Sequence, residues 1–435
     1  MMITYSKKLD VRVKTDVFVA GGGPAGAAAA IAAARAGKSV FLAESTGSFG
    51  GLASAALVPA FATFDDGKNA VCRGIGLEIR NRLVGGAPFE YWTPIRVEAL
   101  KRVYDDMTRE AGVDFMFFTR VCDVLAHDGH IDAVILDGKS GLYAVEADIY
   151  IDCTGDGDLI SFAGGEYVCG DENGALMPPT LCSLFANVDF ARRVLPDDRR
   201  LADAFAAGVF SKEDRHLPGM FIVDEKMGIG GGNIGHVYGV DPTNDASLTK
   251  AMVEGRRLLA EYERYYKEYL VGFESMTLVQ TGAALGVRES RRIRCDYTLC
   301  EKDFLDRAVF DDEIGRYCYP IDIHRNATDE AEYARFLEEY IRKYRYEAGE
   351  SYGIPLRSLI PVSFDNALVA GRCIGTDRPM QASVRVMPGC FITGQAAGAA
   401  AAAAAMKKDV RSADVRTVQR ILRQQDAYLP NAGND

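Results

Sequence analysis

Gly21-Gly22-Gly23-Pro24-Ala25-Gly26 is the stretch that decides the fold, because it joins an apolar run to an alanine-rich run. The apolar run, Asp16 to Ala20, predicts a buried strand, and the alanines predict a helix that begins near Pro24. A second apolar run, Ser39 to Ala43, ends at the acid Glu44. Strand, glycine turn, helix, strand and acid in this order predict a βαβ unit that binds a dinucleotide through its pyrophosphate.

Each part of this motif has a physical task. Gly21 permits a tight exit from the strand, Gly23 lets the backbone approach a phosphate, and Gly26 lets the helix pack close to the sheet. The free N–H groups at the start of the helix face the pyrophosphate. Glu44 can accept both ribose hydroxyls, and a glycine pair soon after it predicts backbone wrapped around the cofactor, with a flexible turn as the alternative. The predicted cofactor-binding residues of this half are Gly21, Gly22, Gly23, Pro24, Ala25, Gly26, Glu44, Ser45, Gly50, Gly51 and Leu52.

Composition narrows the classes of partner. The formal net charge of −11 argues against nucleic acid and against an anionic membrane surface. Residues 1–15 lack the apolar core of a signal peptide, and the tract Gly394 to Met406 is too short and too weakly apolar to span a membrane. We therefore expect a cytoplasmic protein that acts on a small molecule, with a homo-oligomer left open.

The rest of the chain alternates between two kinds of pattern. Residues 120–147 predict an antiparallel meander, and Asp148 to Asp152 predicts a buried strand that runs into a second glycine turn. Residues 165–354 are richer in aromatic side chains and contain two predicted long helices, Ser247 to Leu270 and Asp329 to Tyr346. The second of these helices carries an aromatic stripe that we expect to pack in the core.

These patterns predict an α/β fold with an insertion. A Rossmann-like domain, made of residues 1–165 and 355–435, encloses an inserted α+β substrate domain of residues 166–354. The buried strand Asn366 to Ala370 and an alanine-rich helix, which we expect Gly394 to open, belong to the C-terminal part.

A second glycine motif, formed by Gly230, Gly232 and Gly235, has the same spacing as the first. Residues 236–242 do not continue it with a helical pattern, so the βαβ context fails. We interpret the motif as a glycine-rich loop of the inserted domain, and we expect no tightly held nicotinamide dinucleotide in this chain.

Further motifs follow in a fixed order. They are Phe49-Gly50-Gly51, Cys153-Thr154-Gly155-Asp156-Gly157-Asp158, Gly286-Val287-Arg288-Glu289-Ser290-Arg291-Arg292, Asp322-Ile323-His324, Leu368-Val369-Ala370-Gly371-Arg372-Cys373, Arg385-Val386-Met387-Pro388 and Gly394-Gln395-Ala396-Ala397-Gly398. With the first glycine turn, this set resembles the FAD-dependent oxidoreductase family of the glutathione-reductase-like flavoproteins over almost the whole chain. The resemblance implies that the dinucleotide is FAD, with further contacts at Val121, Thr154, Gly155, Asp156, Gly371 and Arg372.

One position departs from the wider superfamily. Many relatives place an acid after the late glycine to hold the ribityl chain of FAD, whereas Arg372 follows Gly371 here. The ribityl contact is then left to backbone or to another residue. Residues 385–394 precede the predicted C-terminal helix, whose N-terminus would stabilise negative charge on reduced flavin. The residues that we expect to line the flavin there are Met387, Gly389, Cys390 and Phe391.

We expect the cysteines to be reduced and mostly unreactive. The ten cysteines contain no Cys-x-x-Cys pair, which is typical of reduced, mostly buried thiols and predicts no bound metal. Cys295 and Cys300 have the spacing of a redox-active disulfide of some flavoenzymes, but residues 293–299 predict a strand or loop instead of the required helix. Cys390 is read as a small apolar residue at a close-packed turn, with a reactive thiol or a covalent flavin link as the alternative.

The candidate catalytic residues are two histidines and three arginines. His324 and His236 can remove a proton from a hydroxyl or amine, or donate one. Arg288, Arg291 and Arg385 can bind an anionic or oxygen-rich substrate, or the pyrimidine edge of the flavin. A structural hydrogen bond or ion pair is the alternative for each of the five. The other histidines, His127, His130 and His216, fall in a turn or a charged loop.

The favoured function is an FAD-dependent oxidoreductase that transfers hydride between a small polar organic substrate and the flavin. We favour oxidation of a C–H bond beside a hydroxyl or amine. One alternative is fumarate-reductase-like reduction of an activated C=C bond, with an arginine as proton donor. The other is a non-enzymatic redox-responsive flavoprotein. The electron donor or acceptor stays open.

Overall fold

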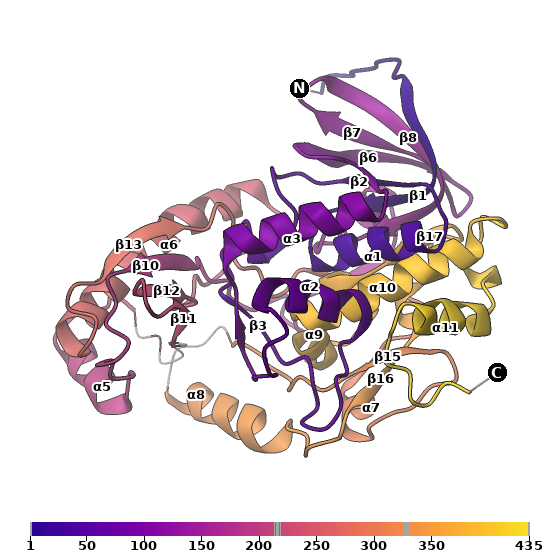
Figure 1. The fold of residues 1–435 in the computed structure, drawn as a ribbon. Helices are drawn as coiled ribbons and strands as arrows, with labels where there is room; N and C mark the ends of the chain where they lie inside the picture. The colour runs from indigo at the N-terminus through magenta and orange to yellow at the C-terminus, as the bar shows by residue number, and fades with distance from the viewer. Residues whose placement is uncertain (1, 213, 215–216, 218, 326–329, 434–435) are drawn as a thin grey trace.

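The computed structural model describes residues 2–212, 214, 217, 219–325 and 330–433 (Figure 1). Its centre is a sheet in which four parallel strands, β2, β1, β8 and β17, run side by side, with β5 beyond β2. All of β2 and β17 and the C-terminal ends of β1 and β8 are mostly apolar and buried, as expected for parallel strands covered on both faces, whereas β5 at the edge is largely exposed. The strands are β1 (Val11–Ala20), β2 (Val40–Ala43), β5 (Asp114–Met116), β8 (Gly141–Asp152) and β17 (Ala367–Val369).

Strand β8 joins this parallel region to an antiparallel meander. Its first half pairs with β7 (His130–Gly138), which pairs in turn with β6 (Thr119–His127). Its second half pairs with β17, and along its length it also pairs with β1, so that Asp152 lies opposite Ala20. The predicted meander is confirmed, but the strand predicted at Asp148 is the end of one longer strand and not a separate element.

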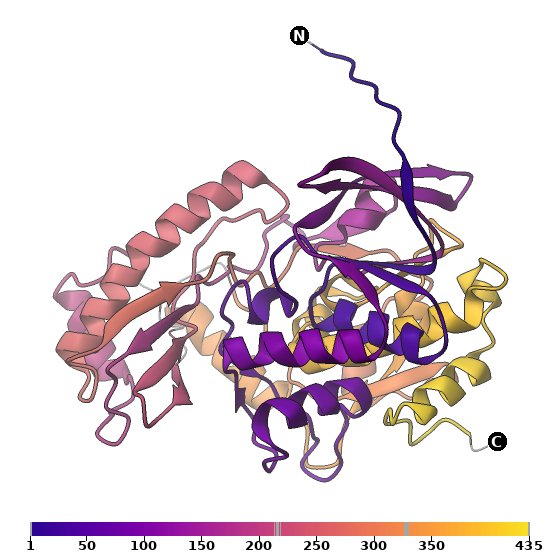
Figure 2. The ribbon, with the colours of Figure 1, turned by 45° about the horizontal axis from the view of Figure 1, so that its top comes forward.

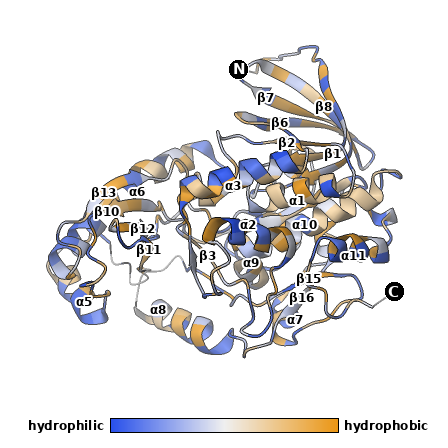
Figure 3. Cartoon of the chain, in the orientation of Figure 1, coloured by the Kyte–Doolittle hydropathy of each residue, from blue (hydrophilic) through white to orange (hydrophobic). Residues whose placement is uncertain are grey.

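Helices α1 (Pro24–Arg35) and α10 (Met387–Ala404) lie side by side and touch through their backbones (Figure 1). A Cβ atom added to Gly394 would lie 2.1 Å from the carbonyl oxygen of Ala25. The same addition at Gly398 would lie 2.2 Å from the carbonyl oxygen of Ala29. Small residues therefore set the distance between these helices, and Figure 3 shows α10 as weakly hydrophobic along its length.

The expected start of the C-terminal helix is wrong. Gly394 does not open it, because α10 begins at Met387 and Gly394 lies inside it as a packing residue. Pro388 occupies the first turn, where its missing N–H and fixed φ are tolerated. The start of α1 near Pro24 is confirmed.

The remaining elements around the sheet are short hairpins and helices. The strand pairs β3–β4, β9–β14 and β15–β16 are antiparallel. The elements are α2 (Gly74–Val84), α3 (Val97–Glu110), α4 (Asp158–Phe162), α7 (Glu301–Leu305), α9 (Arg378–Val384), α11 (Val415–Gln424), β3 (Ala60–Phe61), β4 (Thr93–Pro94), β9 (Tyr167–Cys169), β14 (Arg291–Ile293), β15 (Glu313–Tyr317) and β16 (Tyr352–Pro355). Cys295 and Cys300, between β14 and α7, are free thiols as predicted.

A second sheet, of four antiparallel strands in the order β11-β12-β10-β13, forms a separate lobe with α5 and the long helix α6 (Figure 2). The second glycine motif falls here, and its interpretation as a loop is wrong for Gly230 and Gly232, which belong to β12, and right for Gly235, which lies in the loop after it. Residues 233–244 form no helix, so the βαβ context that the sequence pattern lacks is also missing from the structure. The elements are α5 (Asp198–Ala206), α6 (Asp245–Tyr269), β10 (Ser183–Ala186), β11 (Met220–Asp224), β12 (Ile229–Gly232) and β13 (Thr277–Thr281).

The second predicted long helix is shorter than expected. It consists of α8 (Glu330–Leu337) and a π-helix over Glu338–Lys343, and the predicted start at Asp329 lies outside the described residues. Its aromatic stripe packs only in part, because Phe336 is buried whereas Ile341 is 50% exposed.

Buried apolar side chains form two clusters. One surrounds the seven-stranded sheet and the other lies in the lobe of α6. Phe304, Ile314 and Tyr352, which belong to the predicted insertion, pack in the first cluster. The division of the chain at residues 165 and 354 stays a prediction. None of the helices in the described part of the chain combines the length and apolar character that a membrane crossing requires.

Replacement of Gly26 by alanine is expected to disrupt the junction of β1 and α1. The added Cβ would lie 1.7 Å from the carbonyl oxygen of Gly21, which is backbone and cannot rotate away. We expect the free energy of unfolding to fall by about 1–3 kcal/mol or more, measured by denaturant titration. Gly219→Ala is the control, because nothing lies within 4 Å of its added Cβ. Equal stability of the two variants would contradict this account.

Candidate functional site

The ends of four parallel strands meet at one edge of the central sheet. Ala20 of β1 lies opposite Ala43 of β2 and Asp152 of β8, and Asp152 lies opposite Val369 of β17. The first glycine turn, Glu44, the second glycine turn and the late glycine all follow these strands. In parallel α/β sheets, ligands bind at this carboxyl edge. The fold therefore gathers at one place the segments that the sequence separates.

Glu44 is buried at the end of β2 and holds two neighbouring backbone groups. Its Oε2 accepts the N–H of Gly22 at 2.7 Å, and its Oε1 accepts the N–H of Thr46 at 2.7 Å. Its Oε1 also accepts the hydroxyl of Ser45 at 3.2 Å. A carboxylate has about four lone-pair positions, so acceptor capacity remains for one ribose hydroxyl. Ser45 is exposed beside it, and Val121 lies on β6, whose first residue donates its N–H to the Glu44 carbonyl.

The start of α1 has the features of an anion site. Gly23 is the N-cap, and no side chain caps the helix. A Cβ added to Gly23 would meet only the Cα of Gly51, at 3.8 Å, so the space in front of it is open. Gly50 donates its N–H to the carbonyl of Gly22 and brings this loop alongside. Open space before uncapped N–H groups fits the pyrophosphate of a dinucleotide.

The second glycine turn is fixed against the first. Asp152 is fully buried, and its Oδ1 accepts both the N–H and the hydroxyl of Thr154, at 3.0 and 2.7 Å. A Cβ added to Gly21 would lie 2.7 Å from the carbonyl oxygen of Cys153. Gly155 has a φ of +82°, which favours glycine at the tip of the turn.

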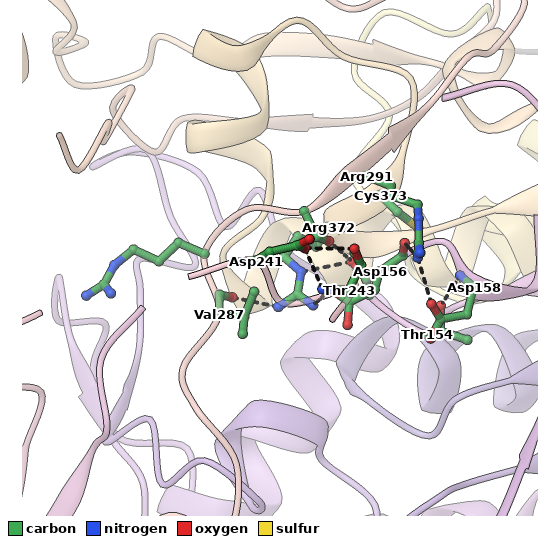
Figure 4. A network of polar contacts seen from close by, with 12 residues as sticks. Thr154, Asp156, Asp158, Asp241, Thr243, Val287, Arg291, Arg372 and Cys373 are labelled. Atoms are coloured by element: carbon green, nitrogen blue, oxygen red, sulfur yellow. Dashed lines mark hydrogen bonds and ion pairs between the residues drawn. The ribbon is translucent and has the colours of Figure 1, made fainter. Parts of the chain in front are cut away.

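Arg372 ties three segments together (Figure 4). Its Nε donates to the carbonyl of Gly155 at 2.8 Å, and its Nη1 donates to that of Val287 at 2.6 Å. Its Nη2 pairs with Asp156 at 2.6 Å. The guanidinium thus acts on protein groups at the edge of the site, beside Gly371, whose N–H donates to Thr393. The predicted contacts of Gly371, Arg372 and the second glycine turn with the cofactor stay predictions.

The first turn of α10 supplies the second helix N-terminus at this edge. Val386 is its N-cap, and again no side chain caps it. Gly389 is in backbone contact with Val384, and Phe391 packs against Phe61. Burial raises the pKa of Cys390 to about 12, so its thiol is neutral at pH 7 and donates to the carbonyl of Arg385 at 3.1 Å.

Two predicted catalytic residues, His236 and His324, lie together in the interior. His236 Nε2 is 2.8 Å from His324 Nδ1, and both side chains are buried. His236 Nδ1 contacts Asp214 Oδ2 at 2.8 Å, and His324 Nε2 contacts Asp322 Oδ2 at 3.3 Å. We call Asp214, His236, His324 and Asp322 the histidine relay. The sequence contained no signal for Asp214 or for the pairing, because the four residues come from separate segments.

The histidine relay is anchored to the start of α10. Arg385, which ends α9, donates from Nη2 to the carbonyl of Asp322 at 3.2 Å and lies 3.6 Å from its carboxylate. Ser383 donates its hydroxyl to the carbonyl of Tyr319 at 2.5 Å. The residues predicted to line the flavin follow directly after Arg385. The relay and these residues are therefore adjacent.

Arg288 and Arg291 are close in the sequence but contact different partners. Arg288 is buried and donates to the Pro178 carbonyl, to Thr180 and to Asn233. Arg291 pairs instead with Asp158 at 2.8 Å and does not join the histidine relay.

The remaining sequence candidates lie elsewhere. Arg292 pairs with the buried Glu289. His127 and His130 pair with Asp132 and Asp365, outside the relay, and His216 lies outside the described residues. Within the described ranges, no group of three or more His, Cys, Asp or Glu side chains is arranged to hold a metal ion.

Comparisons with known proteins identify the family. The model of the FAD dependent oxidoreductase family matches residues 16–422, so the chain belongs to this family, is an enzyme and uses FAD. No curated protein matches the chain. A geranylgeranyl bacteriochlorophyll reductase-like protein from Thermoplasma acidophilum has a TM-score of 0.50 and 12% identity, with 95% of this chain and 83% of that chain covered. At this identity it supports the fold alone.

Two further solved structures score lower. The flavin-dependent brominase Bmp2 has a TM-score of 0.47 at 12% identity, covering 95% of this chain and 84% of its own. The p-nitrophenol 4-monooxygenase PnpA of Pseudomonas putida DLL-E4 has a TM-score of 0.43 at 12% identity, covering 95% and 85%.

Glu44→Ala is expected to lower the FAD content of the purified protein. The change removes the predicted acceptor for the ribose and leaves the N–H groups of Gly22 and Thr46 without the Glu44 carboxylate. We expect at least about tenfold weaker FAD binding, since hydrogen bonds to a charged group contribute about 1.5–3 kcal/mol. FAD released by heat denaturation measures the occupancy. Glu98→Ala is the control, because the Glu98 side chain is 74% exposed and pairs with Lys101 at the surface. Wild-type FAD content in Glu44→Ala would refute the assignment.

Proposed function

We propose that this FAD-dependent oxidoreductase oxidises a small polar organic substrate at a C–H bond beside a hydroxyl or amine. When bound, FAD supplies the acceptor for the hydride of that bond. The protein must then accept the proton of the hydroxyl or amine. The observation that carries the proposal is the buried pair of His236 and His324, with a carboxylate at each end.

Proton counting shows why this arrangement suits a base. Three contacts link the four residues of the histidine relay to one another, and each needs one proton between its two heavy atoms. Two neutral imidazoles carry only two such protons. The relay is therefore one proton short until one ring becomes an imidazolium, which the two carboxylates then stabilise. We infer that the contact between His324 and Asp322 is the one that lacks a proton, because it is 3.3 Å long whereas the other two are 2.8 Å.

Burial gives this base a fixed geometry. His236 and His324 are 3% and 5% exposed, so water does not compete for their hydrogen bonds. His236 holds one nitrogen of His324, and Asp214 holds His236 in turn. The proton of the substrate would bind to His324 Nε2. This nitrogen faces Asp322, whose carbonyl is held by Arg385 at the end of α9. In this scheme His236 and Asp214 position His324 and share the positive charge.

Arg288 favours a second candidate function, the reduction of an activated C=C bond. Burial, followed by repulsion from Arg385, lowers the pKa of Arg288 to about 10. An arginine with a lowered pKa can donate a proton to one carbon of the double bond when the other carbon receives the hydride. The reaction would run in the opposite direction, from reduced FAD to substrate.

The finer architecture and setting are also part of the proposal. The order of the parallel strands and the pairing of α1 with α10 support a glutathione-reductase-like FAD domain with residues 166–354 as its substrate-binding insertion. We also propose a small-molecule substrate, because the acidic composition disfavours nucleic acid as a partner, and a cytoplasmic location. A homo-oligomer is compatible with this proposal.

His324→Asn is expected to slow the reduction of the bound flavin by substrate about 10²–10⁴-fold, the usual effect of losing a general base. Asparagine keeps a polar group near His236 and lacks the nitrogen that faces Asp322. Stopped-flow absorbance with a panel of hydroxy and amino compounds measures the rate, and FAD content should stay at the wild-type level. His127→Asn is the matched control, because the His127 side chain is 65% exposed. Equal rates in wild type and His324→Asn would eliminate the proposed base.

The second candidate function predicts a specific pH profile. A proton donor with a pKa of about 10 is charged below that pH and loses its proton above it. Reoxidation of the photoreduced enzyme by fumarate should then be independent of pH from neutrality to about 10 and fall about tenfold per pH unit above it. A reoxidation rate that stays unchanged above about pH 10 would exclude Arg288 as the donor.

A further inference from the structure

Arg288 is a buried cation without a carboxylate partner in the described part of the chain. It is 6% exposed, and its three acceptors are the Pro178 carbonyl at 2.9 Å, the Thr180 hydroxyl at 3.0 Å and the Asn233 amide oxygen at 3.3 Å. All three are neutral. A guanidinium removed from water is normally paired with an anion, because neutral acceptors replace its hydration only in part.

Arg385 is also incompletely satisfied. Its side chain is 11% exposed, and its Nε is buried without an acceptor. Its nearest carboxylate, Asp322, lies 3.6 Å from Nη2 and is shared with His324 and with the hydroxyl of Tyr319, each at 3.3 Å. One carboxylate thus has three polar neighbours, Tyr319, His324 and Arg385, and the Nε of the Arg385 fork has no acceptor in the described part of the chain.

Helix α9 holds Arg288 and Arg385 close to each other. Gln381 of α9 donates its Nε2 to the carbonyl of Arg288 at 2.8 Å, and Arg385 is the C-cap of the same helix. Repulsion from Arg385, after burial, contributes to the lowered pKa of Arg288. Two like charges that are held close in the interior cost free energy, which a bound anion would offset.

We propose that Arg288 and Arg385 bind the carboxylate group of the substrate, and that the substrate is therefore a hydroxy or amino acid. This rests on the proposed function, since the carboxylate belongs to the molecule that is oxidised. Arg385 and His324 contact the same side chain, Asp322, so the acid group and the group that loses its proton must lie within a few bonds of each other. A planar carboxylate fits a guanidinium fork with two parallel hydrogen bonds.

The site can be tested without turnover. The oxidised holoenzyme is titrated with acetate and benzoate, and with acetamide and benzamide as uncharged counterparts of the same shape, at constant ionic strength. Flavin absorbance reports binding, because the residues predicted to line the flavin follow Arg385 directly. We expect the carboxylates to bind at least about tenfold more tightly than the amides. Equal binding of acid and amide, no binding of either acid, or tighter binding of inorganic phosphate would overturn the proposal.

Two variants locate the site. Arg385→Met should weaken benzoate binding roughly 10–100-fold, the loss expected for a charge-assisted hydrogen bond. Arg288→Lys keeps the buried charge but loses the fork, so it should also weaken benzoate binding while the protein stays folded. Arg307→Met is the control, because Arg307 is 41% exposed and pairs with Glu350. Wild-type affinity in both site variants would refute the assignment. These titrations involve no oxidation, so their outcome does not depend on whether the proposed reaction occurs.

Discussion

The backbone contact between α1 and α10 is the constraint on which the rest of the structure depends. Gly394 lies on Ala25 and Gly398 on Ala29, so the two helices run parallel with their N-termini towards one edge of the sheet. Because α10 starts seven residues before Gly394 and α1 starts one residue before Ala25, the N-terminus of α10 extends about 9 Å beyond that of α1. Two uncapped, positive helix ends thus lie at one edge of the sheet, where they favour a negatively charged ligand.

Local chemistry made part of this fold predictable. The first glycine turn, the acid at the end of β2 and the meander follow from patterns within a few dozen residues. The start of α10 could not be found in this way, because Val386 offers no capping side chain. The strand β12 contradicts the low strand propensity of glycine. It forms because the side chains of Met220 and Phe185 fill the space where Cβ atoms of Gly230 and Gly232 would lie.

The candidate site was predictable by residue type but not by arrangement. Histidine exchanges protons near neutral pH, so residue type alone indicates His236 and His324 as candidates. Their contact depends on tertiary packing between distant segments, which the sequence pattern does not indicate. The same limit applies to the arginines: Arg288 and Arg291 are close in sequence, yet one is buried beside Asn233 and the other pairs with Asp158. Buried charges of this kind add little to stability, because the cost of desolvation offsets their attraction, and groups with perturbed pKa values cluster at functional sites.

The pairing of α1 with α10 also orders events during synthesis. Helix α10, which packs on α1, is synthesised late, because residues 387–404 leave the ribosome long after residues 24–35. At about 5–20 residues per second, the interval is roughly 20–70 s. During that time the small-residue face of α1 and the β17 edge of β8 have no native cover. Nascent chains of this enzyme should therefore depend on chaperones until the last hundred residues have emerged.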